Sequence, residues 1–319
     1  MSHASYFTYT PPKLGDLTAP PKLSCSDVSV VIPVRDNQAG IDRFLTALFE
    51  THDLTTLPHE VIIVDNASAV PIHIAERFEH RGVSVRLLHC ARRGPAAARN
   101  AGAAEATGEW LLFTDSDCAP TPSFITGYAE AMSGAVGYAG SVRAVGDGWL
   151  ARYYESQSIL VPPLGAYDRP LHLITANALV WRPAFETVGG FDERFPDAAG
   201  EDIDLGLRLR QFGELAYAPA AAVVHDFGDS VTQFVRRFVR YGRGNRRLGL
   251  AWDVSMLPRP FTPAVSTAPH WCAAILQYLS LLAGYFVTMW PNHALQRTRP
   301  SRRGCKRTPS WAGSLSLGR

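Results

Sequence analysis

The stretch Leu111-Leu112-Phe113-Thr114-Asp115-Ser116-Asp117 is an apolar run that stops at two carboxylates one residue apart. Such a run is typical of a buried strand, and residues two apart in a strand share one face. We therefore expect Asp115 and Asp117 to reach one site just beyond the strand. Two carboxylates held close repel each other unless a cation lies between them, which favours a divalent metal with a phosphorylated ligand. A plain turn at the strand exit is the competing interpretation.

The overall composition is that of a globular chain with a substantial core. Apolar residues make up 46% of the 319 residues, charged residues make up 19%, and the formal net charge is only +2. Nucleic acid is therefore not an expected partner. The five cysteines form no Cys-x-x-Cys pair, which argues against a disulfide framework or a zinc site and fits a reducing compartment. No charged start followed by an apolar segment opens the chain, so we expect no secretory signal.

Strand and helix patterns alternate through the first 120 residues. We expect strands at 28–32, 61–64, 83–88 and 110–113, and helices at 41–50, 72–80 and 95–106. This order predicts right-handed βαβ units and an α/β fold, with a mostly parallel, Rossmann-like sheet flanked by helices. Ligands bind beyond the carboxyl ends of such strands, and three of these ends are followed by Asp36, Asp65 and the pair Asp115 and Asp117. No Gly-x-Gly-x-x-Gly follows the first strand and no Gly-Lys-Ser/Thr loop occurs, which disfavours dinucleotide and P-loop nucleotide binding.

Five motifs occur in a fixed order along the chain. They are Val30-Val31-Ile32-Pro33-Val34, Ile63-Val64-Asp65-Asn66-Ala67-Ser68, Gly94-Pro95-Ala96-Ala97-Ala98-Arg99-Asn100-Ala101-Gly102, Phe113-Thr114-Asp115-Ser116-Asp117 and Gly200-Glu201-Asp202. Together they resemble the family 2 glycosyltransferases of the GT-A fold. The resemblance covers residues 27–247 and implies a nucleotide-sugar donor, Mn²⁺ or Mg²⁺, and inversion at the anomeric carbon. It divides a catalytic domain over 27–250 into a nucleotide-sugar half over 27–120 and an acceptor half over 121–250.

The resemblance places the donor site at the first strands and the helix after the third strand. Asp65 corresponds to the residue that binds the donor base, and a carboxylate suits the imide N–H of uracil, which favours a UDP-linked sugar. An Asx-turn that closes the strand is the alternative. Pro33 and Arg35 correspond to the rim of the donor pocket. Arg99 and Asn100 correspond to an Ala-Arg-Asn element that lines it, with a solvated helix face as the alternative.

The resemblance also assigns the metal and the chemistry. Asp117 would bind Mn²⁺ or Mg²⁺ directly and Asp115 would lie near the donor ribose and the metal, in keeping with the oxygen ligands of hard cations. His225 is a further ligand candidate because imidazole suits Mn²⁺, although a histidine after a strand is often structural. Asp202 is the implied general base and Glu201 an acceptor-side residue that positions the acceptor or holds the loop. Acidic capping of a helix is the competing explanation for this pair.

The two ends of the chain differ from the middle. Residues 1–26 predict a flexible arm. Residues 232–247 predict a basic amphipathic helix that lies on an anionic membrane, packs on the sheet or binds diphosphate. Residues 271–290 carry no charge and could cross a bilayer or form a core helix. We expect a linker and a membrane-associated or transmembrane helix over 251–291. A disordered basic tail follows over 292–319, and basic residues on both sides of the apolar span oppose a single crossing.

The sequence thus predicts an inverting glycosyltransferase at the cytoplasmic face of the cell membrane, or in the cytoplasm if the apolar helix is buried. The acceptor would be a saccharide, a lipid-linked sugar or a small molecule, and cell envelope polysaccharide biosynthesis is one setting. Two alternatives stay open. One is a sugar-phosphate nucleotidyltransferase, although the first strand leads into no glycine-rich loop. The other is a non-catalytic scaffold that binds nucleotide-sugars.

Overall fold

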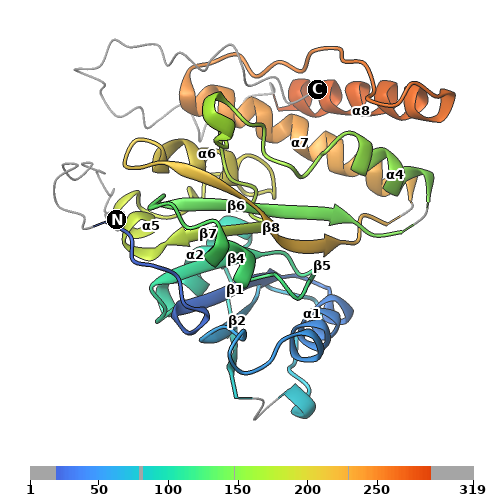
Figure 1. Cartoon of the computed structure of the whole chain (residues 1–319). Helices are drawn as coiled ribbons and strands as arrows, with labels where there is room; N and C mark the ends of the chain where they lie inside the picture. The colour runs from blue at the N-terminus through green and yellow to red at the C-terminus, as the bar shows by residue number, and fades with distance from the viewer. Residues whose placement is uncertain (1–18, 79–81, 147, 229, 289–319) are drawn as a thin grey trace, which may run out of the picture.

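A single eight-stranded sheet organises the chain in the computed structural model, which describes residues 19–78, 82–146, 148–228 and 230–288. The strand order is β3-β2-β1-β4-β7-β6-β8-β5 (Figure 1). The strands are β1 (Val28–Val34), β2 (Glu60–Asp65), β3 (Ser84–His89), β4 (Trp110–Thr114), β5 (Cys118–Pro120), β6 (Gly137–Ala144), β7 (Asn177–Trp181) and β8 (Leu215–His225). Most of the expected N-terminal arm and all of the expected basic tail lie outside the described residues.

Helices and short turns connect the strands. The helices are α1 (Gln38–Thr51), α2 (Pro95–Glu105), α3 (Thr126–Glu130), α4 (Trp149–Ser156), α5 (Arg182–Thr187), α6 (Glu201–Leu209), α7 (Val231–Trp252) and α8 (Ala268–Val287). The 3-10 turns are η1 (Cys25–Asp27), η2 (Glu76–Phe78) and η3 (Ala166–Asp168). The expected α/β architecture is therefore confirmed.

The first half of the sheet is parallel, as expected. β1 pairs in parallel with β2 and with β4, and β2 pairs in parallel with β3. Every residue of β2 and β4 is buried, because both faces of a parallel sheet are covered and its strands therefore read as continuous apolar runs. Gly102 of α2 packs directly against Val31 and Val64, so this helix lies close to β1 and β2.

The second half of the sheet is mixed. β7 is antiparallel to β4, β6 is antiparallel to β7, and β5 is antiparallel to β8, while β6 and β8 are parallel. The apolar sequence of residues 176–180 predicts a strand, which β7 matches, but the direction of this strand is not evident from the sequence. β7 follows a long irregular segment, and the length of such a connection does not determine whether the next strand runs parallel or antiparallel.

The expected helix over 72–80 was wrong in its described part, where the turn η2 is the only helical segment. Side chains bind the backbone groups that a helix would use there. The N–H of Ile72 donates to Asp65 Oδ2 at 3.3 Å. Gln38 of α1 donates to the carbonyl oxygen of His73 at 2.9 Å and accepts from the His73 N–H at 3.0 Å. These bonds hold the segment extended against the end of β2.

The apolar C-terminal helix is present as α8 and lies beside α7, on the side of the sheet away from β2 (Figure 1). By length and composition alone, α8 could cross a membrane. Glycines allow the two helices to pack closely. A Cβ atom on Gly242 would overlap the carbonyl oxygen of Leu281, and one on Gly284 would overlap that of Val239. The expected boundary at residue 250 falls inside α7, so these helices are continuous with the part that precedes them.

The glycine contact gives a stability prediction. Gly284→Val places a side chain against the α7 backbone and should lower the free energy of unfolding by about 1–3 kcal/mol, as overpacking typically does. Urea denaturation followed by circular dichroism measures the change. Ala283→Val is the matched control because Ala283 is exposed on the same helix, and it should be nearly neutral. Equal losses in the two variants would argue against the close contact.

Candidate functional site

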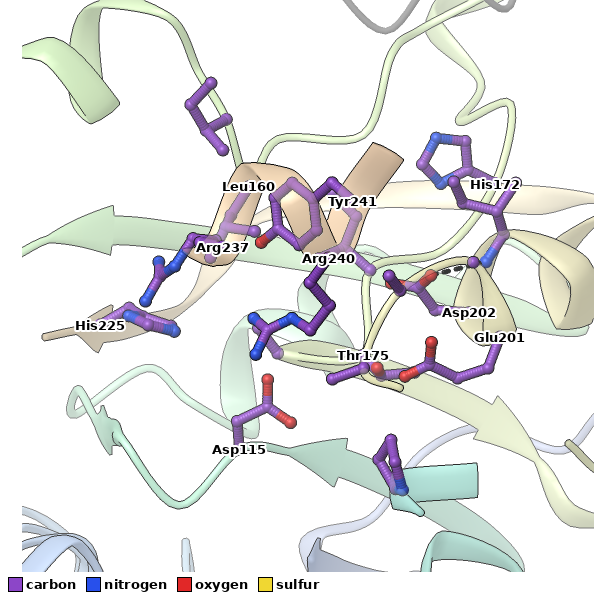
Figure 2. Close-up of a pocket in the computed structure, with 18 of the residues that line it drawn as sticks. Asp115, Leu160, His172, Thr175, Glu201, Asp202, His225, Arg237, Arg240 and Tyr241 are labelled. Carbon is purple, nitrogen blue, oxygen red and sulfur yellow. Dashed lines mark hydrogen bonds between the residues drawn. The ribbon is translucent and has the colours of Figure 1, made fainter. Parts of the chain in front are cut away.

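A cavity of about 1100 Å³ lies between the carboxyl ends of β1 and β4 and the helices α7 and α8. Eight of the residues singled out in the sequence line it: Pro33, Arg35, Arg99, Asp115, Asp117, Glu201, Asp202 and His225. Figure 2 shows Asp115 at the end of its strand, Glu201 and Asp202 at the start of their helix, and the α7 side chains Arg237, Arg240 and Tyr241 facing them. Segments far apart in the chain thus converge on one space.

Asp65 and Asn100 lie outside the described lining of the cavity. Asp65 is buried, and its carboxylate accepts hydrogen bonds from the Ser68 and Ile72 N–H groups at 3.0 and 3.3 Å. Asn100 accepts from the Phe191 N–H and donates to the Phe191 carbonyl oxygen, both at 2.9 Å. Both side chains fix local backbone in this structure, and their contact with a donor stays a prediction.

Arg99 connects the two acidic motifs. Its guanidinium is 1% exposed and donates from Nη2 to Asp115 Oδ1 at 2.7 Å and from Nη1 to Glu201 Oε1 at 2.9 Å. The ring of Phe191 lies 5.5 Å from the guanidinium carbon. A planar guanidinium with several donors suits this bridging position. The end of β4 and the start of α6 are therefore held together by one buried cation.

The two carboxylates after β4 are presented by a turn rather than by strand alternation. β4 ends at Thr114, and the Cys118 N–H donates to the Asp115 carbonyl oxygen at 3.1 Å to close the turn. Asn37 donates from Nδ2 to the carbonyl oxygen and hydroxyl of Ser116, each at 3.1 Å. The expectation that both carboxylates face the same space holds, since both line the cavity. The expected mechanism, a shared strand face, was wrong.

Asp117 and His225 form a second pair on the same wall. Asp117 Oδ1 lies 3.3 Å from His225 Nε2, because β5 and β8 pair with Cys118 opposite His225. The His225 ring stacks on Phe227 at 4.3 Å, and its buried Nδ1 has no hydrogen-bond partner among the described residues. Burial lowers the pKa of His225, so the ring is a neutral imidazole, the form that binds metals.

The donor atoms here fit a divalent metal. The ligand atoms of Asp117, Cys118 and His225 all lie within 4.8 Å of one another. A carboxylate oxygen with a neutral imidazole suits Mn²⁺ better than Mg²⁺. Burial raises the pKa of the Cys118 thiol well above its usual range, which leaves the other two as the ligand candidates. Asp115 is outside this cluster and is paired with Arg99.

The first residues of α6 are two acids, of which Glu201 is buried and Asp202 is half-buried. Gly200 precedes the helix with a φ of +93°, a left-handed conformation that glycine adopts without strain. Burial, reinforced by the charge of Asp202, raises the pKa of Glu201 to about 7. Burial also raises the pKa of Asp202. A carboxylate with a raised pKa is a stronger base, which suits proton abstraction near neutral pH.

His172, Arg237 and Arg240 are among the polar cavity residues that were not selected from the sequence as site residues. His172 is 1% exposed and lies beside Asp202 (Figure 2). Its Nδ1 is 2.9 Å from the Leu173 carbonyl oxygen, which fixes the proton on Nδ1, and its Nε2 has no partner among the described residues. No periodic pattern surrounds it in the sequence. Arg237 and Arg240 belong to the predicted basic helix, where their spacing beside the aromatic stripe was the available signal.

Removal of the Arg99 guanidinium should destabilise the protein strongly. Arg99→Leu leaves the buried Glu201 without its cation, and breaking such a pair typically costs about 3–5 kcal/mol. Denaturant titration measures the loss. Adding Glu201→Gln removes the uncompensated charge and should recover part of the stability. A double variant less stable than Arg99→Leu alone would contradict the assigned pairing.

Known proteins share both the sequence pattern and the fold. The pre-mycofactocin glycosyltransferase of Mycobacterium tuberculosis is 35% identical over 233 residues, which cover 68% of this chain and 46% of that protein. The chain spans about half the length of the curated relatives it matches. The mannosyltransferase PcManGT from Pyrobaculum calidifontis, solved with GDP-Man and Mn²⁺, matches with a TM-score of 0.51 and 17% identity over 86% of this chain and 76% of that one. The TarS fragment 1–349 of S. aureus, solved with UDP-GlcNAc, matches with a TM-score of 0.52 and 16% identity over 70% and 65%.

Family models give the same result. The model for glycosyl transferase family 2 matches residues 29–189, and the model for glycosyl transferase family group 2 matches residues 110–296. The first covers the donor-side motifs and the second extends through α8. The GT-A fold expected from the five motifs is confirmed by the structural matches. The chain belongs to glycosyl transferase family 2.

Proposed function

We propose that this chain is an inverting glycosyltransferase that moves a sugar from a nucleotide-diphosphate sugar to an acceptor hydroxyl. The observation that carries the proposal is the convergence of Asp115, Asp117 and Asp202 on one cavity. Family membership supports a glycosyl transfer reaction. The solved complexes with GDP-Man and UDP-GlcNAc support a nucleotide-sugar donor. Uracil remains the base that Asp65 favours, which corresponds to a UDP-linked donor, and the sugar is left open.

Cationic groups support diphosphate binding in this cavity. Arg237 and Arg240 extend from α7 toward Asp115 and His225 (Figure 2). Arg93 lines the cavity next to the N-terminus of α2. Guanidinium groups and helix N-termini both favour phosphate oxygens. The diphosphate would therefore lie between α7, the start of α2 and the turn after β4.

Asp202 is the proposed general base. Its carboxylate would take the proton of the acceptor hydroxyl as that oxygen bonds to the anomeric carbon. The bond from this carbon to the diphosphate oxygen breaks at the same time and the diphosphate keeps the electron pair. A single displacement from the opposite face inverts the configuration. Glu201 would hold Asp202 in place through its ion pair with Arg99.

Asp117 and His225 are the proposed holders of Mn²⁺ or Mg²⁺, and the Mn²⁺ in the PcManGT complex supports a divalent metal. When bound, the metal supplies positive charge that neutralises the departing diphosphate. A contribution of Asp115 beside the donor ribose remains part of the proposal.

We also propose that the protein works at the cytoplasmic face of a membrane. α8 exposes Trp271, Ile275, Leu279 and Phe286 along its outer side, each 40–55% accessible. These side chains would lie in the lipid interface, where Trp is favoured. A lipid-linked acceptor fits this placement, and a saccharide or small-molecule acceptor stays compatible with a cytoplasmic location.

The Asn variant of Asp202 tests the general base. Asp202→Asn keeps the shape of the side chain but not its basicity, so nucleotide binding should persist while kcat for transfer falls about 10²–10⁴-fold. Asp204→Asn, in the same helical turn but outside the described cavity lining, should retain transfer. Parental turnover by Asp202→Asn would refute the assigned role. Loss of slow donor hydrolysis in the same variant would also separate an enzyme from a non-catalytic scaffold.

Metal dependence tests the Asp117–His225 pair. With Mn²⁺, a nucleoside diphosphate at 100 times its Kd should stabilise the protein by about 2.7 kcal/mol by mass action. Asp117→Ala should remove the Mn²⁺-dependent part of the rise in Tm. Asp226→Ala is the matched control, since Asp226 is half-exposed and outside the described lining. Mn²⁺-dependent stabilisation that survives in Asp117→Ala would count against ligation there.

A further inference from the structure

The loop after α4 forms an apolar wall of the cavity. Residues 159–164 read Ile-Leu-Val-Pro-Pro-Leu, and all six line the cavity. Leu164 is 41% exposed. Six consecutive apolar residues on an irregular loop match neither the helical nor the strand period. The other five residues are part-buried or buried. Loops are usually polar, so an apolar run that lines a cavity points to an interaction site.

This apolar wall is held in place by the fold. Leu160 packs against both the main core of the sheet and the apolar cluster formed by α4, α7 and α8. The Val161 N–H donates to the Ser158 carbonyl oxygen, and the Leu171 N–H donates to that of Pro163, both at 2.9 Å. Two adjacent prolines further restrict the backbone. A preformed apolar surface binds a ligand with little ordering cost.

The wall reaches the proposed base. Leu171, which is hydrogen bonded to Pro163, directly precedes His172, and His172 lies beside Asp202 (Figure 2). The proton on His172 Nδ1 is engaged by Leu173, so the buried Nε2 carries a lone pair that has no partner among the described residues. The polar end of this region can therefore accept hydrogen bonds from hydroxyl groups, while the opposite end is apolar.

Space in the cavity supports a separate place for the acceptor. Ligand pockets typically measure about 300–1000 Å³, and this cavity measures about 1100 Å³. The proposed donor residues come from β1, β4 and α2, whereas the apolar wall lies on the side of α7 and α8, with Leu281 and Phe261 nearby in the lining. A nucleotide-sugar bound at the strand ends leaves this second region open.

We propose that the acceptor is an amphiphilic alcohol, whose hydroxyl end lies at Asp202 and His172 and whose apolar portion lies against residues 159–164. This inference rests on the proposed function and names the class of its acceptor. Free sugars lack the apolar portion and would be poor acceptors. A lipid-linked alcohol and a soluble alcohol with an alkyl or aromatic group share the required chemistry.

Calorimetry with n-alkyl β-glucosides, from butyl to octyl and below their micelle-forming concentrations, tests this class. Affinity should rise roughly four-fold per buried methylene, with a negative heat-capacity change that marks apolar burial. The double variant Val161→Thr/Leu164→Asn keeps the branched shape of both side chains and should weaken octyl glucoside binding about ten-fold or more. Affinity that does not depend on alkyl length, or that is equal in both proteins, would overturn the proposal.

Leu279→Asn is the matched control, because Leu279 is 54% exposed on α8 and outside the described lining. This control should bind octyl glucoside with unchanged affinity. If Leu279→Asn lost affinity and the double variant did not, the alkyl chain would bind on α8, and the proposed role of residues 159–164 would be refuted. Nucleoside diphosphate binding with Mn²⁺, measured in the same proteins, should be unaffected. Its absence from the parental protein would instead refute the donor site.

A final experiment distinguishes a lipid-linked acceptor from a soluble amphiphilic acceptor. The glucosyl headgroup is presented on a diacyl lipid in vesicles of phosphatidylethanolamine and phosphatidylglycerol, and vesicles without it are the reference. Tighter binding to the vesicle-held glucolipid than to octyl glucoside supports a lipid-linked acceptor. Tighter binding to octyl glucoside supports a free amphiphile. Both results depend on the apolar wall, so the double variant should bind the preferred ligand more weakly in either case.

Discussion

The buried guanidinium of Arg99 is the interaction on which the site depends. Asp115 and Glu201 come from segments far apart in the chain, and both carboxylates face one buried region. Without a cation between them, their charges would repel and their burial would be costly. With Arg99 in place, the end of β4 is fixed against the start of α6. The donor side of the cavity at the end of β4 and the proposed base at the start of α6 are thereby held in fixed positions relative to each other.

The same region connects the C-terminal helices to the site. Gly200, which precedes α6, lies against Phe195 and the carbonyl oxygen of Gly244 in α7, so a side chain there would crowd both. α7 in turn places Arg237 and Arg240 in the cavity. It packs closely on α8 because Gly242 has no side chain to keep the two helices apart. A segment that looks like an appendage in the sequence is therefore part of the cavity. This agrees with a family model that extends to residue 296.

Local patterns predicted the elements whose burial is complete. β1, β2 and β4 were evident because strands covered on both faces are continuous apolar runs, and the acidic motifs were evident because they follow such runs or open a helix. The departure of the described residues 72–78 from the expected helix was not predictable, because Gln38 binds that segment from a distant helix. His172 was missed for a similar reason: its tautomer and its place beside the base depend on tertiary contacts. Strand direction in the second half likewise depends on long connections that carry no periodic signal.

The two faces of α8 bear on how it could meet a membrane. Its inner face buries Gln277, which accepts a hydrogen bond from the Tyr153 hydroxyl at 2.7 Å, and also Ser280. Its outer face exposes apolar side chains. A helix surrounded by lipid would have to leave α7 and expose these polar groups to hydrocarbon, which is costly. A helix in the plane of the interface keeps the α7 contact and covers only the apolar face. Such a placement involves no crossing, so the conflict that a single crossing would create with the positive-inside rule does not arise.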